Sequence, residues 1–349
     1  MPKRTLLTGV AYHGNRMLSH AVADMREIAQ ADMDVVVHML SQTDRDRHKT
    51  VMKDIFAATE DAGLDVWVDC WGLGGPPGDV SNFLAYHPEC HAYFSNGELM
   101  APYACLNHPT YRDFVKGWID DVYEMGARTI FWDEPHLGTK KAENGEILYG
   151  CSCPTCKKLF EERYNRPMPR ELDEDVIQFR TDTIVDYLGT VSTYAALHGM
   201  TNAVCVMFVP ELGSNLDLLD RICTLPNMHN VGSDPYWYGQ EGAHPYEYVY
   251  SRAKATVEMA NKCQKDHNVW IQTYNVPRGR EEEIIEATAA AYDAGARTLL
   301  AWGYHGSESN TYRAKNPMRT WDLTIEAMKR VRAMERDRIL EENRKRFMK

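Results

Sequence analysis

The amino-acid sequence predicts an α/β protein, a single (β/α)₈ TIM barrel that spans residues 1–349. Eight short β-like runs alternate with helical patterns, which is typical of parallel strands joined by crossover helices. A chain of 349 residues is also long enough for one barrel of this kind. The tetrapeptide Gly-Ala-Arg-Thr occurs at 126–129 and again at 295–298, just before the fourth and eighth runs. The two copies lie half a barrel apart, although chance similarity of two turns explains them equally well.

In the first half of the chain, apolar runs at 5–12, 34–40, 65–70 and 128–132 predict strands one to four. Helices are expected from about Ser19, the candidate N-cap of the first, and then over 44–62 and 109–125. Gly63 and Gly126 follow the second and third helices, where a residue in the left-handed conformation commonly ends a helix. The long segment 79–107 has mixed signals, and we interpret it as an excursion over the end of the barrel.

The second half begins with an expected insertion at about 136–166, a cysteine-rich loop that ends in a short helix over 154–164. Strands five to eight are predicted at 202–209, 230–233, 268–274 and 297–302. Long helices are predicted over 169–198, 215–224, 245–266, 280–294 and 317–348. The last of these carries Ile325, Met328, Val331 and Met334 at near-helical spacing. Packing on the barrel explains this stripe, and a subunit interface in a homo-oligomer is the alternative.

The composition limits what the protein binds. The formal charge of −11 argues against a nucleic-acid partner, because phosphate binding needs a clustered basic surface. No apolar run reaches the roughly 18 residues of a membrane span, and the N-terminus lacks the apolar segment of a signal peptide. The nine cysteines are odd in number and mostly scattered, which favours a reducing compartment over a disulfide framework. We therefore expect a cytoplasmic protein without nucleic-acid or membrane partners.

The most informative stretch is 129–136, with the sequence Thr-Ile-Phe-Trp-Asp-Glu-Pro-His. Its apolar run is stopped by Asp133 and Glu134, and Pro135 prevents the strand from continuing. The active site of a (β/α)₈ barrel lies at the carboxyl ends of its strands. Glu134 is therefore the first candidate for a catalytic acid, and Asp133 is a candidate for binding the substrate or orienting its neighbours.

Polar and aromatic residues are expected at the carboxyl ends of the other strands too. Carboxylates bond sugar hydroxyls, Trp and Tyr rings stack on sugar rings, and glycoside hydrolysis needs two carboxyl groups across the scissile bond. The candidate partners of Glu134 are Asp234 after strand six and Glu211 after strand five. The other candidates for substrate binding are His13, Asp69, Trp71, Tyr236, Trp237, Gln272, Tyr274, Asn275, Trp302 and Glu308. Packing alone is the alternative role for Trp237 and Trp302.

Three cysteines lie close together in the insertion, in the pattern Cys151-Ser-Cys153-Pro-Thr-Cys156. Three thiolates on a tight loop suit Zn²⁺, which takes four ligands in a closed structural site. Cys105 is the best candidate for the fourth ligand because it precedes the third helix on the same face of the barrel, and His108 and His136 are its rivals. Three reduced cysteines without a metal are the alternative.

This combination resembles family 42 of the glycoside hydrolases, the β-galactosidase type. The resemblance covers about 102–164 and rests on these residues: Cys105, Asn107, Pro109, Trp132, Glu134, Cys151, Cys153 and Cys156. It implies a (β/α)₈ barrel, a structural zinc site formed by the four cysteines, and Glu134 as the general acid.

The sequence departs from that family at two places. Asp133 stands where the wider clan of retaining glycosidases has an asparagine that bonds the sugar 2-hydroxyl. Strand seven carries Gln272, Tyr274 and Asn275 where the family has its nucleophilic glutamate, so the resemblance supplies no nucleophile.

We therefore expect a glycoside hydrolase that cleaves a small oligosaccharide or glycoside, with Glu134 as the acid and Asp234 or Glu211 as nucleophile or base. In a variant of this scheme, Asp133 is the nucleophile. One alternative is a metal-dependent TIM-barrel isomerase or hydrolase, with ligands drawn from His13, His38, Glu134, Glu211, Asp234 and His305. The other is a non-catalytic sugar-binding barrel. Apart from zinc, no cofactor is expected, and in particular no organic one.

Overall fold

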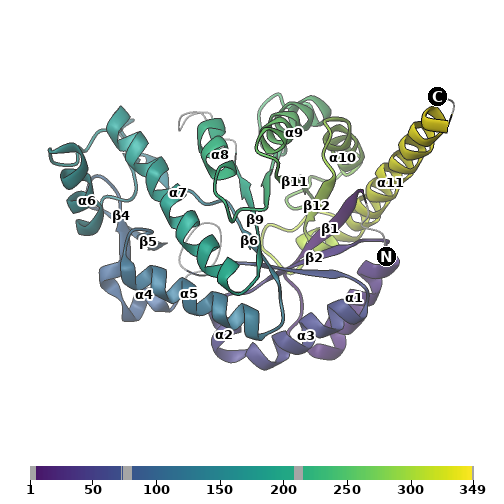
Figure 1. The fold of residues 1–349 in the computed structure, drawn as a ribbon, viewed down its shortest axis with the longest axis horizontal. Coiled ribbons are helices and arrows are strands. Elements are labelled where there is room, and N and C mark those ends of the chain that lie inside the picture. The colour runs from purple at the N-terminus through teal and green to yellow at the C-terminus, as the bar shows by residue number, and fades with distance from the viewer. Residues whose placement is uncertain (1–4, 72, 74–80, 208–214, 348–349) are drawn as a thin grey trace. The chain divides into compact units, whose positions relative to one another are not determined.

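The computed structural model describes residues 5–71, 73, 81–207 and 215–347. Eight parallel strands form a closed barrel in the order β1-β12-β11-β10-β9-β6-β3-β2. Figure 1 labels most of these strands and the helices that follow them. The predicted TIM barrel is therefore confirmed. The barrel strands are β1 (Leu7–Tyr12), β2 (Val35–Met39), β3 (Asp65–Asp69), β6 (Thr129–Trp132), β9 (Thr201–Val206), β10 (Asn230–Ser233), β11 (Asp266–Gln272) and β12 (Thr298–Trp302).

Helices follow the strands along the chain, as a (β/α)₈ fold requires. The longer ones are α1 (Leu18–Gln30), α3 (Lys49–Asp61), α5 (Pro109–Glu124), α6 (Pro154–Tyr164), α7 (Glu174–Leu197), α8 (Asn215–Cys223), α9 (Pro245–Lys262), α10 (Glu283–Asp293) and α11 (Pro317–Phe347). Shorter ones are α2 (Gln42–Arg47), α4 (Phe83–Tyr86), η1 (Pro88–Cys90) and η2 (Tyr304–Ser307). Among the described helices, none is both long and apolar enough to cross a membrane.

Three local expectations differ from the structure. The first helix begins at Leu18 after Met17, so Ser19 lies inside its first turn and is not the N-cap. The predicted helix 44–62 is two helices, α2 and α3, which are separated at His48. A capping box formed by Ser41 and Asp44 starts α2 two residues earlier than predicted. The excursion 79–107 contains an antiparallel hairpin of β4 (His91–Tyr93) and β5 (Leu99–Ala104). A second hairpin, β7 (Thr139–Lys141) with β8 (Ile147–Tyr149), lies in the insertion.

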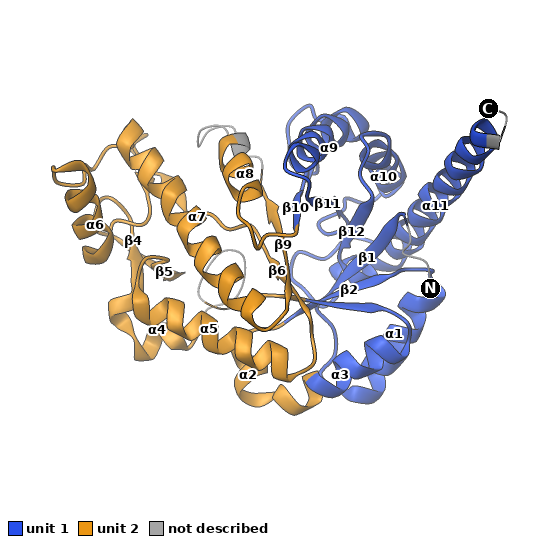
Figure 2. Ribbon diagram, in the orientation of Figure 1, with its two compact units in different colours: residues 1–39, 53–67, 230–349 blue, residues 40–52, 68–229 orange. Residues whose placement is uncertain are grey.

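The chain divides into two compact units, shown in different colours in Figure 2. Unit 1 comprises residues 1–39, 53–67 and 230–349, and unit 2 comprises residues 40–52 and 68–229. Each unit carries part of the barrel, and the candidate residues are divided between them. Glu134 and the four cysteines belong to unit 2, whereas Asp234 and most of the aromatic candidates belong to unit 1.

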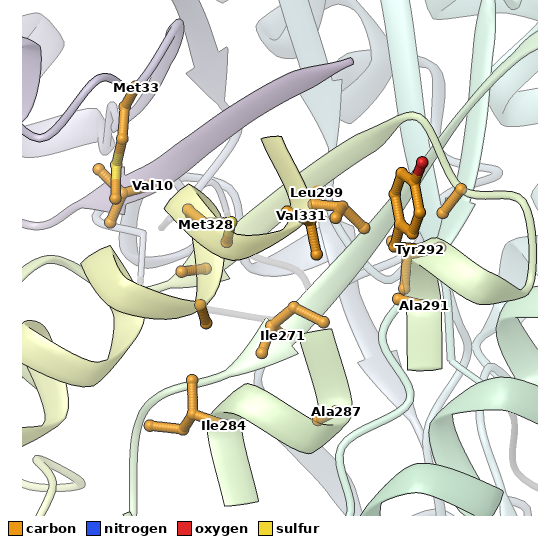
Figure 3. Packing of buried hydrophobic residues seen from close by; sticks show 14 of the residues in the cluster. Val10, Met33, Ile271, Ile284, Ala287, Ala291, Tyr292, Leu299, Met328 and Val331 are labelled. Atoms are coloured by element: carbon orange, nitrogen blue, oxygen red, sulfur yellow. The ribbon is translucent and has the colours of Figure 1, made fainter. Parts of the chain in front are cut away.

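The core of unit 1 is formed by aliphatic side chains from strands and from the last two helices (Figure 3). Leu299 and Ile271 from the strands pack with Ile284 of α10 and with Met328 and Val331 of α11. Met328 and Val331 are each only 1% exposed, so this part of the stripe on the terminal helix packs inside its own unit.

Unit 2 has a separate apolar cluster under the cysteine-rich insertion. The four sulfur atoms of Cys105, Cys151, Cys153 and Cys156 lie in a cluster with Phe160 of α6 and, from α7, Val176 and Phe179. Buried aromatic and aliphatic groups thus anchor the insertion onto α7, the same helix that runs beside the strand-four loop.

Candidate active site and metal centre

Three acidic residues of unit 2 lie at the ends of two neighbouring strands of the barrel. Asp69 is the last residue of β3, and Asp133 and Glu134 directly follow β6. Asp69 is fully buried and Asp133 is 6% exposed, whereas Glu134 is half-buried. The thiol of Cys205, on β9, donates a hydrogen bond of 3.3 Å to Oδ1 of Asp133. The predicted acid pair is thus joined by a third acid from the next strand.

The burial of these groups changes their acidity. Desolvation raises the pKa of Asp133 well above its ordinary value, and the neighbouring charge of Glu134 raises it further. Desolvation also raises the pKa of Asp69, with further contributions from Asp133 and then Glu134, while the backbone N–H of Trp71 opposes the shift. Both aspartates therefore favour the protonated form in the folded protein. Strongly perturbed acids grouped at strand ends are typical of functional sites.

Glu134 has a backbone conformation that is uncommon for its residue type. Its φ angle is 36°, in the left-handed region where a side chain with a Cβ is strained. The ring Nδ1 of His136 donates a hydrogen bond of 2.7 Å to the carbonyl oxygen of Glu134, which helps to hold this turn. Such strain at a half-buried acid is a feature that active sites often retain.

Glu134 lines a cavity of about 310 Å³ in unit 2. Its walls come from the loop after β6, from α7, from the end of β9 and from the start of α8. A smaller cavity of about 40 Å³ is lined by Asp133 together with Cys70 and Trp132. The two adjacent acids therefore face different spaces, with Glu134 at the larger cavity and Asp133 at the smaller one.

Arg180 of α7 holds the loop that carries Glu134. This side chain is 9% exposed, and its guanidinium donates to three backbone carbonyls, those of Leu137 at 2.6 Å, Gly138 at 3.5 Å and Gly150. Burial lowers the pKa of Arg180 to about 10, so the group remains charged at neutral pH. One buried cation thus ties the strand-four loop to the residue that precedes Cys151.

The four cysteines predicted as metal ligands come together in unit 2. The sulfur atoms of Cys105, Cys151, Cys153 and Cys156 are all buried and lie within 4.8 Å of one another. The sulfurs of Cys105 and Cys156 are 3.5 Å apart. Tetrahedral Zn–S bonds of about 2.3 Å would separate the sulfurs by about 3.8 Å, so this cluster has the size of such a site. His108 is the partner of Cys90, with Nδ1 and Sγ 3.2 Å apart.

Two N–H groups that donate to the cluster's sulfur atoms support a metal-binding role. The side-chain Nδ2 of Asn107 is 3.4 Å from the Cys156 sulfur, and the backbone N of Cys156 is 3.5 Å from the Cys153 sulfur. Hydrogen bonds of this kind stabilise thiolates that bind a metal. Asn107, two residues after Cys105, thus contacts the cysteine cluster through its side chain.

In unit 1, several predicted residues form a line of touching rings. His13 lies edge-on to Trp302 at 5.3 Å and to Tyr312 at 6.4 Å between ring centroids. Tyr312 in turn contacts Tyr274 at 5.6 Å, and Tyr274 contacts Tyr236 at 5.2 Å. Asp234 is 4% exposed, two residues before Tyr236, whose N–H donates to the Asp234 carbonyl at 2.7 Å.

Other predicted residues of unit 1 make contacts inside the unit. Trp237 is 1% exposed, and its Nε1 donates to Glu283 at 2.9 Å, so its ring packs in the core. Gln272 accepts the backbone N–H of Tyr238 at 2.9 Å. The backbone N–H of Asn275 donates to the Tyr312 carbonyl at 2.7 Å.

Two histidines named as alternative metal ligands also have partners within unit 1. Nε2 of His38 is 3.0 Å from the Thr59 hydroxyl, and Nε2 of His305 is 2.9 Å from Glu27. Glu308 is exposed and lies 3.7 Å from Nδ1 of His305. Trp71 is half-buried at the end of β3, and Glu211 lies outside the described residues.

Three residues at these sites were not predicted. Cys205 looks like one more apolar residue of strand five, and Arg180 occupies one position in a long helix, so neither carries a local signal. Tyr312 lies in the polar segment after strand eight, and this position after a strand end is the one sequence signal that marks it as a candidate site residue.

Comparison with known proteins gives the fold but no family. No model of a protein family matches this sequence, and no curated protein matches it. The structure is similar to a β-galactosidase from the Antarctic haloarchaeon Halorubrum lacusprofundi, with a TM-score of 0.69, 13% identity, and coverage of 93% of this chain and 58% of that one. It is also similar to the catalytic domain of a β-amylase from Paenibacillus polymyxa, with a TM-score of 0.66, 8% identity, and coverage of 92% and 98%.

A third similar structure is an endo-β-1,4-mannanase from Thermotoga petrophila, with a TM-score of 0.56, 12% identity, and coverage of 95% of this chain and 77% of that one. At these identities the likeness establishes the barrel alone. The chemistry must be argued from the residues themselves.

Proposed function

We propose that the protein is a glycoside hydrolase in which Glu134 is the general acid. The observation that carries the proposal is the position of Glu134, a half-buried acid in a strained turn at a strand end, which lines a cavity of about 310 Å³. Two protonation-prone aspartates lie beside it. The barrel is shared with a β-galactosidase, a β-amylase and a mannanase, which adds support for carbohydrate as the substrate.

In this scheme Glu134 gives its proton to the glycosidic oxygen while the bond from that oxygen to the anomeric carbon breaks. A second carboxylate attacks the anomeric carbon or activates water. Asp234 and Glu211 remain the candidates for that role. Carboxyl groups about 5–5.5 Å apart imply retention of configuration, and about 6.5–9.5 Å implies inversion.

Asp133 fits substrate binding better than nucleophilic attack. Its raised pKa favours the neutral acid, and only an ionised carboxylate is an effective nucleophile. As a neutral acid, Asp133 both donates and accepts a hydrogen bond, so it can bind a sugar hydroxyl.

We propose Zn²⁺ as the ion held by Cys105, Cys151, Cys153 and Cys156. With four thiolates the ion has no open position, so its contribution is to hold the fold. None of the nine cysteines forms a disulfide bond, which suits a ligand role and the proposed cytoplasmic location. Arg180 donates to the carbonyl of Gly150, which directly precedes Cys151, and also to that of Leu137. The cysteine-rich insertion therefore supports the loop that carries Glu134.

The two alternatives have less support. A metal-dependent isomerase or hydrolase needs ligands at the strand ends, and within the described ranges the cysteine cluster is the one group of His, Cys, Asp and Glu close enough to share an ion. A non-catalytic sugar-binding barrel has no need for two buried acids beside Glu134.

Glu134→Gln tests the proposal. On a methyl or benzyl glycoside of a sugar chosen by a nitrophenyl screen, kcat should fall by about 10²–10⁴-fold, because an alcohol leaving group needs the proton that the amide cannot supply. Glu143→Gln, at an exposed glutamate in the same unit, is the matched control and should keep full activity. Undiminished hydrolysis by Glu134→Gln would exclude Glu134 as the acid.

A further inference from the structure

We propose that the cavity beside Glu134 binds an apolar leaving group, so that the substrate is an aryl or branched-alkyl glycoside and not a longer sugar chain. This inference rests on the proposed function, because it assigns to this cavity the group that departs with the glycosidic oxygen. It adds a class of substrate that the strand-end acids by themselves do not indicate.

The larger part of the cavity wall is apolar. The apolar side chains include Ile177 and Ile184 of α7, Val206 of β9 and Leu218 of α8. Ile184, Val206 and Leu218 are 5%, 3% and 8% exposed, whereas Ile177 is 36% exposed at the rim. Ile177 is thus an apolar side chain of α7 that is exposed to solvent beside the cavity. Exposed apolar residues of this kind are typical of a site that binds an apolar group.

Three polar side chains in the walls, those of His136, Arg180 and Thr181, have partners within the protein, whereas Asp217 brings a second carboxyl group to the cavity beside Glu134. The guanidinium of Arg180 is committed to three backbone carbonyls, and Nδ1 of His136 donates to the Glu134 carbonyl. The Thr181 hydroxyl donates to the Ile177 carbonyl at 3.0 Å. A second sugar ring would bring several hydroxyls into these walls, and each hydroxyl left without a partner costs binding energy. An apolar group avoids that cost.

The volume also limits the occupant. About 310 Å³ is near the lower end of small-molecule sites, which span roughly 300–1,000 Å³. One aromatic ring with a short substituent, or a branched alkyl group, fits this space, and a chain of sugars does not.

The chemistry of departure agrees with apolar walls. The bond between the anomeric carbon and oxygen breaks, its electron pair stays on the oxygen, and Glu134 supplies the proton. The leaving group is then a neutral alcohol or phenol, and water provides the hydroxyl that the sugar gains. A neutral product is compatible with aliphatic walls, whereas an alkoxide or phenolate is not.

The test compares benzyl and methyl glycosides of one sugar, chosen by a nitrophenyl screen. The wild type should favour the benzyl glycoside by at least about 10-fold in kcat/KM, as expected when an apolar pocket is filled. Ile177→Asn should reduce that preference about 5-fold or more, and Ile177→Val should preserve it. Leu197→Asn changes an apolar residue of the same helix that is 78% exposed and lies away from the cavity, so the preference should stay at its wild-type value.

Equal kcat/KM for the two glycosides, or an unchanged preference in Ile177→Asn, overturns the inference while leaving the hydrolase proposal intact. If the wild type hydrolyses no glycoside, the proposed function fails, and the cavity is then tested by calorimetry with benzyl alcohol. Binding that Ile177→Asn weakens and Leu197→Asn does not supports an apolar-ligand site, and binding that is absent or insensitive to Ile177 refutes it.

Discussion

Replacing Arg180 with methionine tests whether one buried cation holds the loop that carries Glu134. Methionine keeps an unbranched apolar stem but removes all donors to the carbonyls of Leu137, Gly138 and Gly150. A hydrogen bond to a charged group contributes about 1.5–3 kcal/mol, and the bond to Gly138 is long at 3.5 Å. Two strong bonds therefore give about 3–6 kcal/mol, from which the cost of burying the guanidinium must be subtracted.

The lowered pKa of Arg180 shows that this desolvation cost is real. We therefore expect Arg180→Met to reduce the free energy of unfolding by about 3 kcal/mol, within the range for breaking a buried polar network. Arg180→Lys should lose less, about 1–2 kcal/mol, because an ammonium keeps the charge but cannot bond three carbonyls in a fork.

Urea unfolding at pH 7 measures these differences, with Arg330→Met as the control at an arginine whose side chain is 58% exposed. As a positioning residue, Arg180 should also affect catalysis in the folded fraction. At a temperature far below the transition, kcat should fall more than KM rises, because the Glu134 loop is displaced. A loss of stability under about 1 kcal/mol, similar to that of Arg330→Met, would refute the reasoning.

Three further predictions concern Glu134, Asp69 and Cys105. Glu134→Gly should be more stable to urea than Glu134→Ala by about 1 kcal/mol, because glycine accepts the φ of 36° without strain, and both variants should be inactive. Asp69 has a folded pKa above its unfolded value, so its contribution to stability is lost as pH rises from about 4 toward that raised pKa. The unfolding free energy of Asp69→Asn should therefore exceed that of the wild type by an amount that grows with pH, at up to about 1.4 kcal/mol per unit, and an advantage that is constant with pH contradicts this. Purified protein should contain one zinc per chain, and Cys105→Ser should lose the metal and about 3 kcal/mol of stability, the effect of a ligand present at a few hundred times its dissociation constant. Full zinc content in that variant would exclude Cys105 as a ligand.

The fold was predictable because its signals are local. Pro135 after two acids marks the end of β6, and Pro154 with a preceding thiol N-cap gives α6 the predicted bounds. The cysteine spacing likewise indicates a cluster. The two small hairpins were missed because β4, β7 and β8 have only three residues each, too few to show an alternating pattern, and β5 is interrupted by Pro102.

The parts of the site that could not be predicted depend on contacts between distant residues. The Cys205 thiol reaches Asp133 across 72 positions of sequence, and Arg180 reaches Leu137 across 43. Nothing in the pattern of α7 shows that its arginine points inward to carbonyls. From its sequence neighbours alone, a buried arginine that bonds backbone carbonyls cannot be distinguished from an exposed arginine.

The positions of Asp69, Asp133 and Glu134 indicate that the three acids have different roles. Burying Asp69 and Asp133 costs stability, and a strand end that served packing alone would carry apolar residues there. Only Glu134 of the three lines the larger cavity, while Asp133 faces the smaller one with Cys70 and Trp132. Because their pKa values are raised, Asp69 and Asp133 limit the negative charge around Glu134, which lines the larger cavity together with Asp217 of α8. If Asp69→Asn is both more stable and less active, the cost of burial serves the reaction, as in other trade-offs between stability and function. If it is more stable and fully active, the buried acids have no part in the chemistry, and Glu134 acts without them.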